Sequence, residues 1–270
     1  MTPCRRSSRA ARALCSAIAA ALAGASLIGC GGATEVGTGG TKGLPTSTAY
    51  LGTVASTTGS VGSLSLTFAT ATMVARSGAR PAGAPTAASI APVAVTGTLV
   101  LDGTSVDLSG TLTDSTLQMS DEAGDWTVQG TLSGGVLKGS FTGPGGEAGS
   151  IAAMASSVGV PVLAYCGTYA DTAVDNPEDT QAGSFTAVIA GAYLLGSVVT
   201  AANVVQDFSG TASGSSFYIN QIVASTTLSA SGSYSAASES DAGAFDGSYE
   251  VSTVEGAARS GGLSATTVCD

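Results

Sequence analysis

A regular alternation of apolar and polar side chains across residues 93–141 constrains the fold of this chain more than any other feature. Alternation with a period of two places every second side chain on the same face of a β-strand. Asp102-Gly103 interrupts the pattern, and this pair favours a tight hairpin turn because both central positions need positive φ. The rhythm continues beyond turns at 121–124 and at Gly134-Gly135. Short alternating strands separated by turns are typical of an antiparallel meander, barrel or sandwich, so we expect an all-β fold.

The second half of the chain repeats motifs of the first half in the same order. These matches predict two tandem antiparallel meanders of about eight strands each, similar to up-and-down barrels. Glycine recurs inside the strands, for example at Gly110 and Gly210, which fits a sharply curved barrel wall. The sequence leaves open whether the copies form two barrels or two halves of one body. The matched motifs are Ala-Tyr-Leu-Gly-Thr at 49–53 with Ala-Tyr-Cys-Gly-Thr at 164–168, Asp-Leu-Ser-Gly-Thr at 107–111 with Asp-Phe-Ser-Gly-Thr at 207–211, and Gly-Ser-Phe at 139–141 with Gly-Ser-Tyr at 247–249.

The N-terminal segment has the layout of a bacterial export signal. Arginines at positions 5, 6, 9 and 12 precede an uncharged apolar stretch at 13–28, which is too short for a comfortable membrane span. The stretch ends in Leu27-Ile28-Gly29-Cys30, which resembles the lipobox of bacterial lipoprotein precursors. The resemblance implies that the chain is cut before Cys30 and that Cys30 carries a diacylglycerol. An ordinary secretory signal, with Cys30 left as a plain thiol, is the alternative.

The same resemblance bears on where the protein is located. In lipoproteins of bacteria with two membranes, aspartate after the lipidated cysteine often means retention in the inner membrane. Gly31 occupies that position here, so the resemblance implies a cell-envelope protein of the outer membrane in a cell that has one. Two or more acyl chains give stable anchoring without a transmembrane helix.

Composition divides the chain into five expected segments. The stretch after Cys30 is rich in Gly, Thr and Ser, which predicts a flexible tether. An Ala- and Pro-rich stretch at 76–92 predicts a long loop within the first copy. The expected segments are a lipoprotein signal peptide at 1–29, the tether at 30–47, the first meander at 48–155, a linker at 156–163 and the second meander at 164–270.

The charge of the exported part limits its partners. The chain has 9 basic and 19 acidic residues, and removal of the four signal arginines leaves 5 basic residues and a net charge of −14. A field of this sign repels nucleic acid and anionic membrane surfaces, so no nucleic-acid partner is expected. The expected partners are the membrane, through the lipid on Cys30, and a protein or glycan of unknown identity.

Two of the five cysteines are left for a disulfide. Cys4 and Cys15 leave with the signal and Cys30 carries lipid, so Cys166 and Cys269 remain in an oxidising compartment. Cys166 lies in the first predicted strand of the second copy, and Cys269 follows its last predicted strand. These strands are neighbours in a closed meander, which predicts a Cys166–Cys269 disulfide. Two free thiols or bridges between molecules are the alternatives.

The residue types exclude most catalytic machinery. The chain contains no histidine, which excludes Ser-His-Asp and Cys-His catalysis and histidine-ligated metals. It has no P-loop, no G-x-S-x-G elbow and no G-x-G-x-x-G motif. Paired carboxylates, as in glycosidases, are the remaining catalytic resource, but aromatic residues make up only 5% of the chain. We therefore expect no enzyme activity, with a carboxylate-dependent hydrolase as the least favoured alternative.

The densest acidic cluster is a candidate calcium site. Calcium takes roughly six to eight oxygen ligands, which acidic side chains in one loop can supply. The spacing here does not match an EF-hand loop, and a solvated acidic turn that begins at Asn176-Pro177 is the alternative. We expect no cofactor unless calcium binds here. The candidate ligands are Asp171, Asp175, Asn176, Glu178 and Asp179.

The up-and-down rhythm and the Gly-Thr-Tyr opening at 167–169 resemble avidin-like and lipocalin-like barrels in rhythm only. An avidin-type pocket uses several tryptophans, and this chain has one, Trp126. We expect an envelope module of structural or adhesion type, with a small-ligand, glycan or calcium binding module as the alternative. A packed interior favours the first and a cavity favours the second. The aromatic residues expected in the core are Trp126, Tyr165, Tyr169, Phe185, Tyr193, Phe208 and Phe217.

Overall fold

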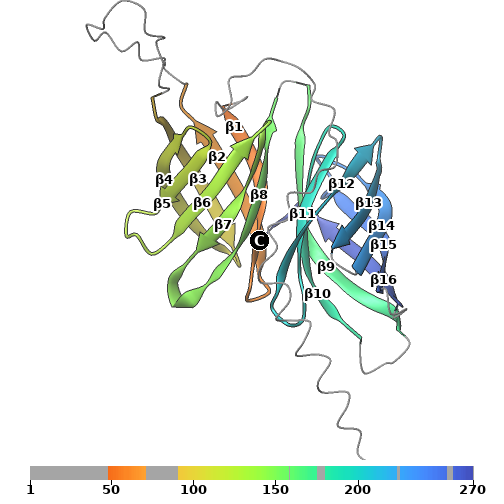
Figure 1. Cartoon of the computed structure of the whole chain (residues 1–270). Coiled ribbons are helices and arrows are strands. Elements are labelled where there is room, and N and C mark those ends of the chain that lie inside the picture. Colours follow the sequence, from red (N-terminus) through yellow and green to blue (C-terminus); the bar gives the residue numbers. More distant parts are fainter. Residues whose placement is uncertain are drawn as a thin grey trace, which may run out of the picture. The chain divides into compact units, whose positions relative to one another are not determined.

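The computed structural model describes residues 48–70, 91–157, 159–174, 180–223, 226–253 and 258–269. In these residues the chain forms two closed antiparallel barrels of eight strands each, which confirms the expected all-β fold of two tandem meanders (Figure 1). The signal segment, Cys30 and the tether lie outside the described residues. The part of the chain that the structure describes contains no helix that could cross a membrane.

Barrel 1 is an up-and-down meander in which each strand pairs with the next and the last strand returns to the first. The closing pair aligns Val54 with Ile151, and both side chains point into the core. A single 3₁₀ turn, η1 (Pro144–Gly146), connects the last two strands. The strands are β1 (Ala49–Ser56), β2 (Val61–Phe68), β3 (Val93–Leu101), β4 (Thr104–Thr113), β5 (Thr116–Ser120), β6 (Thr127–Ser133), β7 (Val136–Thr142) and β8 (Ala148–Ser156).

Barrel 2 has the same up-and-down order and closes by pairing its last strand with its first. The closing pair contains a β-bulge between Ser260 and Gly261. A bulge adds a residue to one strand and bends it, which helps the sheet to close. The strands are β9 (Val162–Val174), β10 (Ala182–Ala190), β11 (Tyr193–Val199), β12 (Val205–Ser213), β13 (Ser216–Val223), β14 (Thr226–Tyr234), β15 (Ala244–Thr253) and β16 (Ala258–Thr266).

The three repeated motifs occupy equivalent strands of the two barrels. The Ala-Tyr-x-Gly-Thr motifs lie in β1 and β9, which are the first strands. The Asp-x-Ser-Gly-Thr motifs lie in β4 and β12, which are the fourth strands, and the Gly-Ser-aromatic motifs lie in β7 and β15, which are the seventh. The repeat in the sequence is therefore a repeat of whole meanders.

The hairpin turns follow the expected chemistry. Asp102 and Gly103, between β3 and β4, have φ values of 50° and 69°. Gly134 and Gly135, between β6 and β7, have φ values of 59° and 80°. Two consecutive positive φ values match the twist of the flanking strands, so these turns hold each hairpin in register.

Glycine inside the strands allows the walls to curve tightly. A Cβ on Gly110 would lie 2.0 Å from the carbonyl oxygen of Gln118 on β5, and a Cβ on Gly210 would lie 2.4 Å from that of Tyr218 on β13. No side chain fits at such distances, so the neighbouring strands come close only because these positions are glycine.

The inward side chains of each barrel form its hydrophobic core. In barrel 1, Trp126 is 9% exposed and its ring lies 6.1 Å from that of Phe141. In barrel 2, Phe245 stacks on Phe217 with ring centroids 4.0 Å apart. The expectation of a core position is confirmed for the buried aromatic residues Trp126, Tyr165, Tyr169, Phe185, Phe208 and Phe217.

A second layer of buried residues lies on the outer faces of strands from both barrels. Ser184 Oγ in β10 donates to the carbonyl oxygen of Gly59, at 2.7 Å. Ser197 Oγ donates to Asp207, so the 2.9 Å bond between Ser150 and Ser197 uses the proton of Ser150. These contacts join two closed barrels, which answers the question that the sequence left open. The apolar members of the layer are Leu51, Val136, Ala152, Met154, Val162, Val188, Ala190 and Leu195.

Candidate functional site

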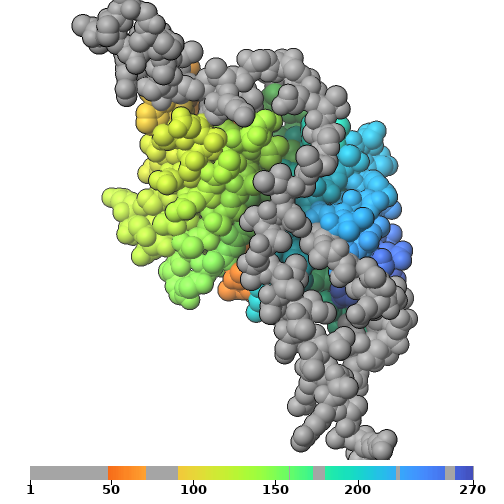
Figure 2. Space-filling view, in the orientation of Figure 1, coloured from red at the N-terminus to blue at the C-terminus, as the bar shows by residue number. Residues whose placement is uncertain are grey.

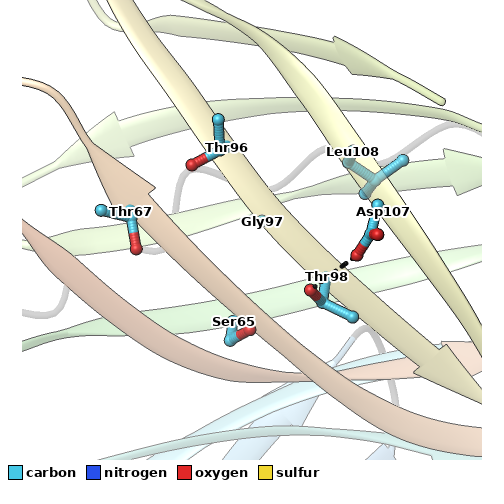
Figure 3. Close-up of a pocket in the computed structure, with 7 residues that line it drawn as sticks. All are labelled: Ser65, Thr67, Thr96, Gly97, Thr98, Asp107 and Leu108. Atoms are coloured by element: carbon cyan, nitrogen blue, oxygen red, sulfur yellow. Dashed lines mark hydrogen bonds between the residues drawn. The ribbon is translucent and has the colours of Figure 1, made fainter. Parts of the chain in front are cut away.

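A shallow depression of about 350 Å³ lies on the outer wall of barrel 1 (Figure 3). Gly97 and the hydroxyl groups of neighbouring strands line it. Figure 2 shows the wall of this barrel, in yellow and green, as a continuous surface of packed atoms. The lining residues come from β2, β3 and β4 and are Ser65, Thr67, Thr96, Gly97, Thr98, Asp107 and Leu108.

Strand register brings the polar groups of this depression together. Ser65, Thr98 and Asp107 are cross-strand partners in one row. Thr98 Oγ1 donates to Asp107 Oδ1 at 3.1 Å, as Figure 3 shows. The site offers hydroxyl groups and one carboxylate, which can hydrogen-bond a polyhydroxylated or cationic ligand. The Thr98–Asp107 pair is exposed to solvent, and among the described residues no third side chain is recorded that orients it as in a catalytic triad.

A buried carboxylate at one end of barrel 2 forms a second candidate site. The Asp171 side chain in β9 is 1% exposed. The hydroxyl of Tyr249 donates to Asp171 Oδ1 at 2.5 Å, and the backbone N–H of Gln181 donates to Oδ2 at 2.8 Å. Arg259 Nη1 lies 3.6 Å from Oδ2. Two hydrogen-bond donors and one guanidinium therefore compensate a carboxylate that would otherwise be costly to bury.

A β-bulge in the pairing of β9 with β16 lies beside this cluster. Gly261 pairs with Asp171 directly after the bulge. A Cβ on Gly261 would lie 2.5 Å from the hydroxyl oxygen of Tyr249, so a larger residue would displace the phenol from the carboxylate. The ring of Tyr169 meets that of Tyr249 edge-on, with centroids 5.8 Å apart.

The tyrosines of the cluster are held in the protonated form. Burial raises the pKa of Tyr249, and its hydrogen bond to Asp171 raises that pKa further. Burial also raises the pKa of Tyr169, with Arg259 acting in the opposite direction. A phenol with a raised pKa donates a hydrogen bond at neutral pH and gives up its proton only in strong alkali. The two tyrosines therefore act as hydrogen-bond donors near neutral pH, and the cluster is suited to holding the end of the barrel together.

The structure describes one of the five candidate ligands of the expected calcium site, Asp171. Asp171 points to Tyr249 and Arg259, and its carboxylate oxygens already accept from neighbours. Asp175, Asn176, Glu178 and Asp179 lie outside the described residues. Within the described ranges, no three acidic, histidine or cysteine side chains come together to hold a metal ion.

The expected disulfide is present between Cys166 in β9 and Cys269 beyond the end of β16. Cys30, the expected lipidation site, lies outside the described residues.

Sequence reasoning was wrong about one aromatic residue and missed part of the Asp171 cluster. Tyr193 was expected in the core, but it is 52% exposed on the outer wall of barrel 2. Tyr249 belongs to the repeated Gly-Ser-aromatic motif, which indicated a repeat but no contact with Asp171. Arg259 was detectable only as one of the few basic residues outside the signal segment.

Comparison with known proteins leaves the family open. No protein-family model and no curated protein matches this chain. Among solved structures, the chain is similar to a protein of unknown function from the DUF3598 family of Nostoc punctiforme. That match has 11% sequence identity and a TM-score of 0.23, and it covers 82% of this chain and 95% of the other.

Proposed function

We propose that this protein is a lipid-anchored module of the bacterial cell envelope with a non-catalytic role of structural or adhesion type. The observation that carries the proposal is that both barrels are filled by their own side chains. An eight-stranded barrel is just wide enough either to be filled by side chains or to hold one small ligand. Large aromatic side chains fill the interior here and leave the outer walls as the surface for contact.

The packing of each interior supports this choice. In barrel 1, Tyr50 and Phe68 are at most 2% exposed, and their rings lie 4.8 Å apart. In barrel 2, Phe245 is fully buried, and its ring centroid lies 5.4 Å from that of Tyr165 and 5.7 Å from that of Phe185. Rings in mutual contact take up the centre of each barrel, where a lipocalin-like protein would hold its ligand.

The chemistry of the chain supports a non-catalytic role. It contains no histidine. The buried carboxylate of Asp171 is held by hydrogen bonds from Tyr249 and Gln181 and by an ion pair with Arg259, which ties it to the barrel wall. A rigid body with a filled core and satisfied buried charges is suited to a scaffold or to the presentation of a surface.

The sequence Leu27-Ile28-Gly29-Cys30 supports the anchor. When the full chain is expressed in a bacterium with an alkyne-bearing fatty acid, the wild type should incorporate the label and enter the detergent phase. Cys30→Ala should do neither, and Cys166→Ala serves as the matched cysteine control that keeps the label. Equal labelling of Cys30→Ala would overturn the anchor.

Native mass spectrometry tests the filled interior. The mass of the purified full chain should equal the processed polypeptide plus its acyl groups. A small molecule that copurifies in equal stoichiometry and leaves only on unfolding would overturn the scaffold role.

A small-ligand binding module is the second candidate, and the depression over Gly97 favours it. Its hydroxyl row and Asp107 could bind a polyhydroxylated ligand. Asp107→Asn would weaken the binding of such a ligand and would leave the fold unchanged, because Asp107 is exposed.

A further inference from the structure

Two tyrosines on the outer wall of barrel 2 are only half-covered by the protein. Tyr193 in β11 and Tyr218 in β13 are each 52% exposed. Their sequence neighbours Leu194, Phe217 and Ile219 are buried in the core of the barrel. Because side chains alternate along a strand, both tyrosine rings therefore lie on the outer face.

The two tyrosines belong to one cross-strand row. Tyr193 pairs with Thr211 in β12, and Thr211 pairs with Tyr218. Neighbouring strands lie about 4.8 Å apart, so two steps separate the backbones of Tyr193 and Tyr218 by roughly 9–10 Å. The row thus presents two aromatic rings with a threonine hydroxyl between them.

The surface around the row is polar and uncharged. The flanking outward positions carry hydroxyl and amide groups that can both donate and accept hydrogen bonds. An apolar protein partner would favour a contiguous apolar patch, whereas here polar side chains surround each ring. These neighbours are the exposed residues Ser209, Thr211, Ser213, Ser216 and Asn220.

Gln221 holds the strands of the row at their normal spacing. Backbone pairing between β12 and β13 extends from Ser213 and Ser216 only as far as Gly210 and Ile219. Beyond that point, Gln221 Nε2 donates to the carbonyl oxygen of Asp207 at 3.2 Å, and its Oε1 accepts from the N–H of Ser209 at 3.0 Å. The side-chain amide takes the place of the missing backbone pair and keeps β13 from splaying away from β12.

From this geometry we infer that the row formed by Tyr193, Thr211 and Tyr218 binds a neutral, extended β-1,4-linked polysaccharide. The C–H face of a sugar ring packs on an aromatic ring, and sugar hydroxyl groups hydrogen-bond to Ser, Thr and Asn side chains. In an extended β-1,4-linked chain every second ring presents the same face, and this repeat is close to the spacing of alternate strands. The acidic charge of the chain disfavours an anionic polymer.

The inference deepens the adhesion role proposed above and rests on it only for the cellular compartment. The test is sedimentation of the purified full chain, in mild detergent, with insoluble cellulose and with insoluble chitin. The wild type should bind one of them or both. Tyr193→Ala and Tyr218→Ala should each weaken binding about tenfold, because each removes one stacked ring. Tyr193→Phe and Tyr218→Phe should keep most of the binding.

Ile222→Ala is the matched control, since Ile222 is 72% exposed on the same strand as Tyr218 but outside the row. It should leave binding unchanged, and circular dichroism should show that every variant is folded. Failure of the wild type to bind either polysaccharide would overturn the inference, as would equal losses in Ile222→Ala. A tyrosine-dependent dimer in light scattering without binding would assign the row to a second copy of the chain. Any of these results would leave the fatty-acid labelling at Cys30 and the native mass unaffected.

Discussion

Cys166 and Cys269 form a disulfide with their Cα atoms 5.1 Å apart, although 103 positions separate them in the sequence. Cys166 lies in β9 and pairs across the barrel seam with Thr266, the last residue of β16. Both cysteines are buried. The bridge fixes the C-terminal end of the chain to the first strand of barrel 2, whereas barrel 1 has Leu51 at the matching position.

Removal of this bridge should destabilise the protein without changing its fold. For a loop of about 100 residues, the chain-entropy model gives up to about 4.7 kcal/mol, and measured losses are usually about 2–4 kcal/mol. Urea unfolding of the double variant Cys166→Ala with Cys269→Ala, monitored by far-UV circular dichroism, measures the loss of unfolding free energy. Reductant should lower the stability of the wild type to that of the variant and leave the variant unchanged. Two thiols that alkylate in the unreduced wild type would contradict the bridge.

Neutralising Asp171 should lower the free energy of unfolding more than neutralising an exposed carboxylate does. Asp171→Asn removes the charge that Tyr249 and Arg259 face and replaces one acceptor oxygen by a donor. We expect a loss of about 1–3 kcal/mol in the free energy of unfolding, measured with urea. Asp246→Asn is the matched control, because Asp246 is exposed and also accepts a side-chain hydrogen bond, from Ser264. Its effect should stay within about 0.5 kcal/mol, and equal effects at both sites would contradict the role of the buried cluster.

The strands and turns were predictable because their signals are local. The alternation across 93–141 and the Asp102-Gly103 pair encode a hairpin without reference to the rest of the chain. The disulfide needed one further step, namely that a closed meander places its first and last strands side by side. The repeated motifs then predicted that the second half of the chain forms the same meander as the first half.

The Asp171 cluster was not predictable, because it depends on contacts between residues far apart in the sequence. Tyr249 and Arg259 reach Asp171 from β15 and β16, and Gly261 has no side chain that would displace the Tyr249 phenol. From the sequence, Asp171 was indistinguishable from the other acidic residues that follow it.

The prediction that Tyr193 lies in the core was wrong for a different physical reason. Its strand contains Leu194 facing the core and Leu195 buried on the outer face. A strand that is buried on both faces reads as a continuous apolar run, so the period that separates inside from outside disappears. The contact with barrel 1 therefore concealed the fact that Tyr193 is exposed.

Buried tyrosines should make the protein unstable in alkali. Burial raises the pKa of Tyr165 from 10.0 to about 12, with a smaller contribution from Tyr234. The folded state therefore holds this proton more tightly than the unfolded state does. The stabilisation is fully present below pH 10 and is lost as the pH rises towards 12, with a slope of up to about 1.4 kcal/mol per pH unit.

Urea midpoints across that pH range measure the alkaline loss. Tyr165→Phe should flatten the slope, because phenylalanine has no proton to release. It should also lower stability below pH 10, since the Tyr165 hydroxyl donates to the carbonyl oxygen of Ser235 at 2.9 Å. A wild type whose midpoint stays constant over the range would contradict the burial of these phenols.

Thr53 should be a position where removal of a polar group stabilises the protein. Its side chain in β1 is 1% exposed, and among the described residues its Oγ1 has no hydrogen-bond partner. A buried hydroxyl that loses water without gaining a partner costs about 1–3 kcal/mol. Thr53→Val replaces the hydroxyl by a methyl group of similar size and should raise the free energy of unfolding by about 1 kcal/mol.

Thr53→Ala should give a smaller gain or a loss, because it leaves a void beside Ala152, the cross-strand neighbour of Thr53. Thr111→Val on the exposed wall of β4 is the control and should change stability by less than about 0.5 kcal/mol. Urea unfolding of the three variants decides the matter, and a Thr53→Val variant less stable than the wild type would mean that the hydroxyl is paired after all.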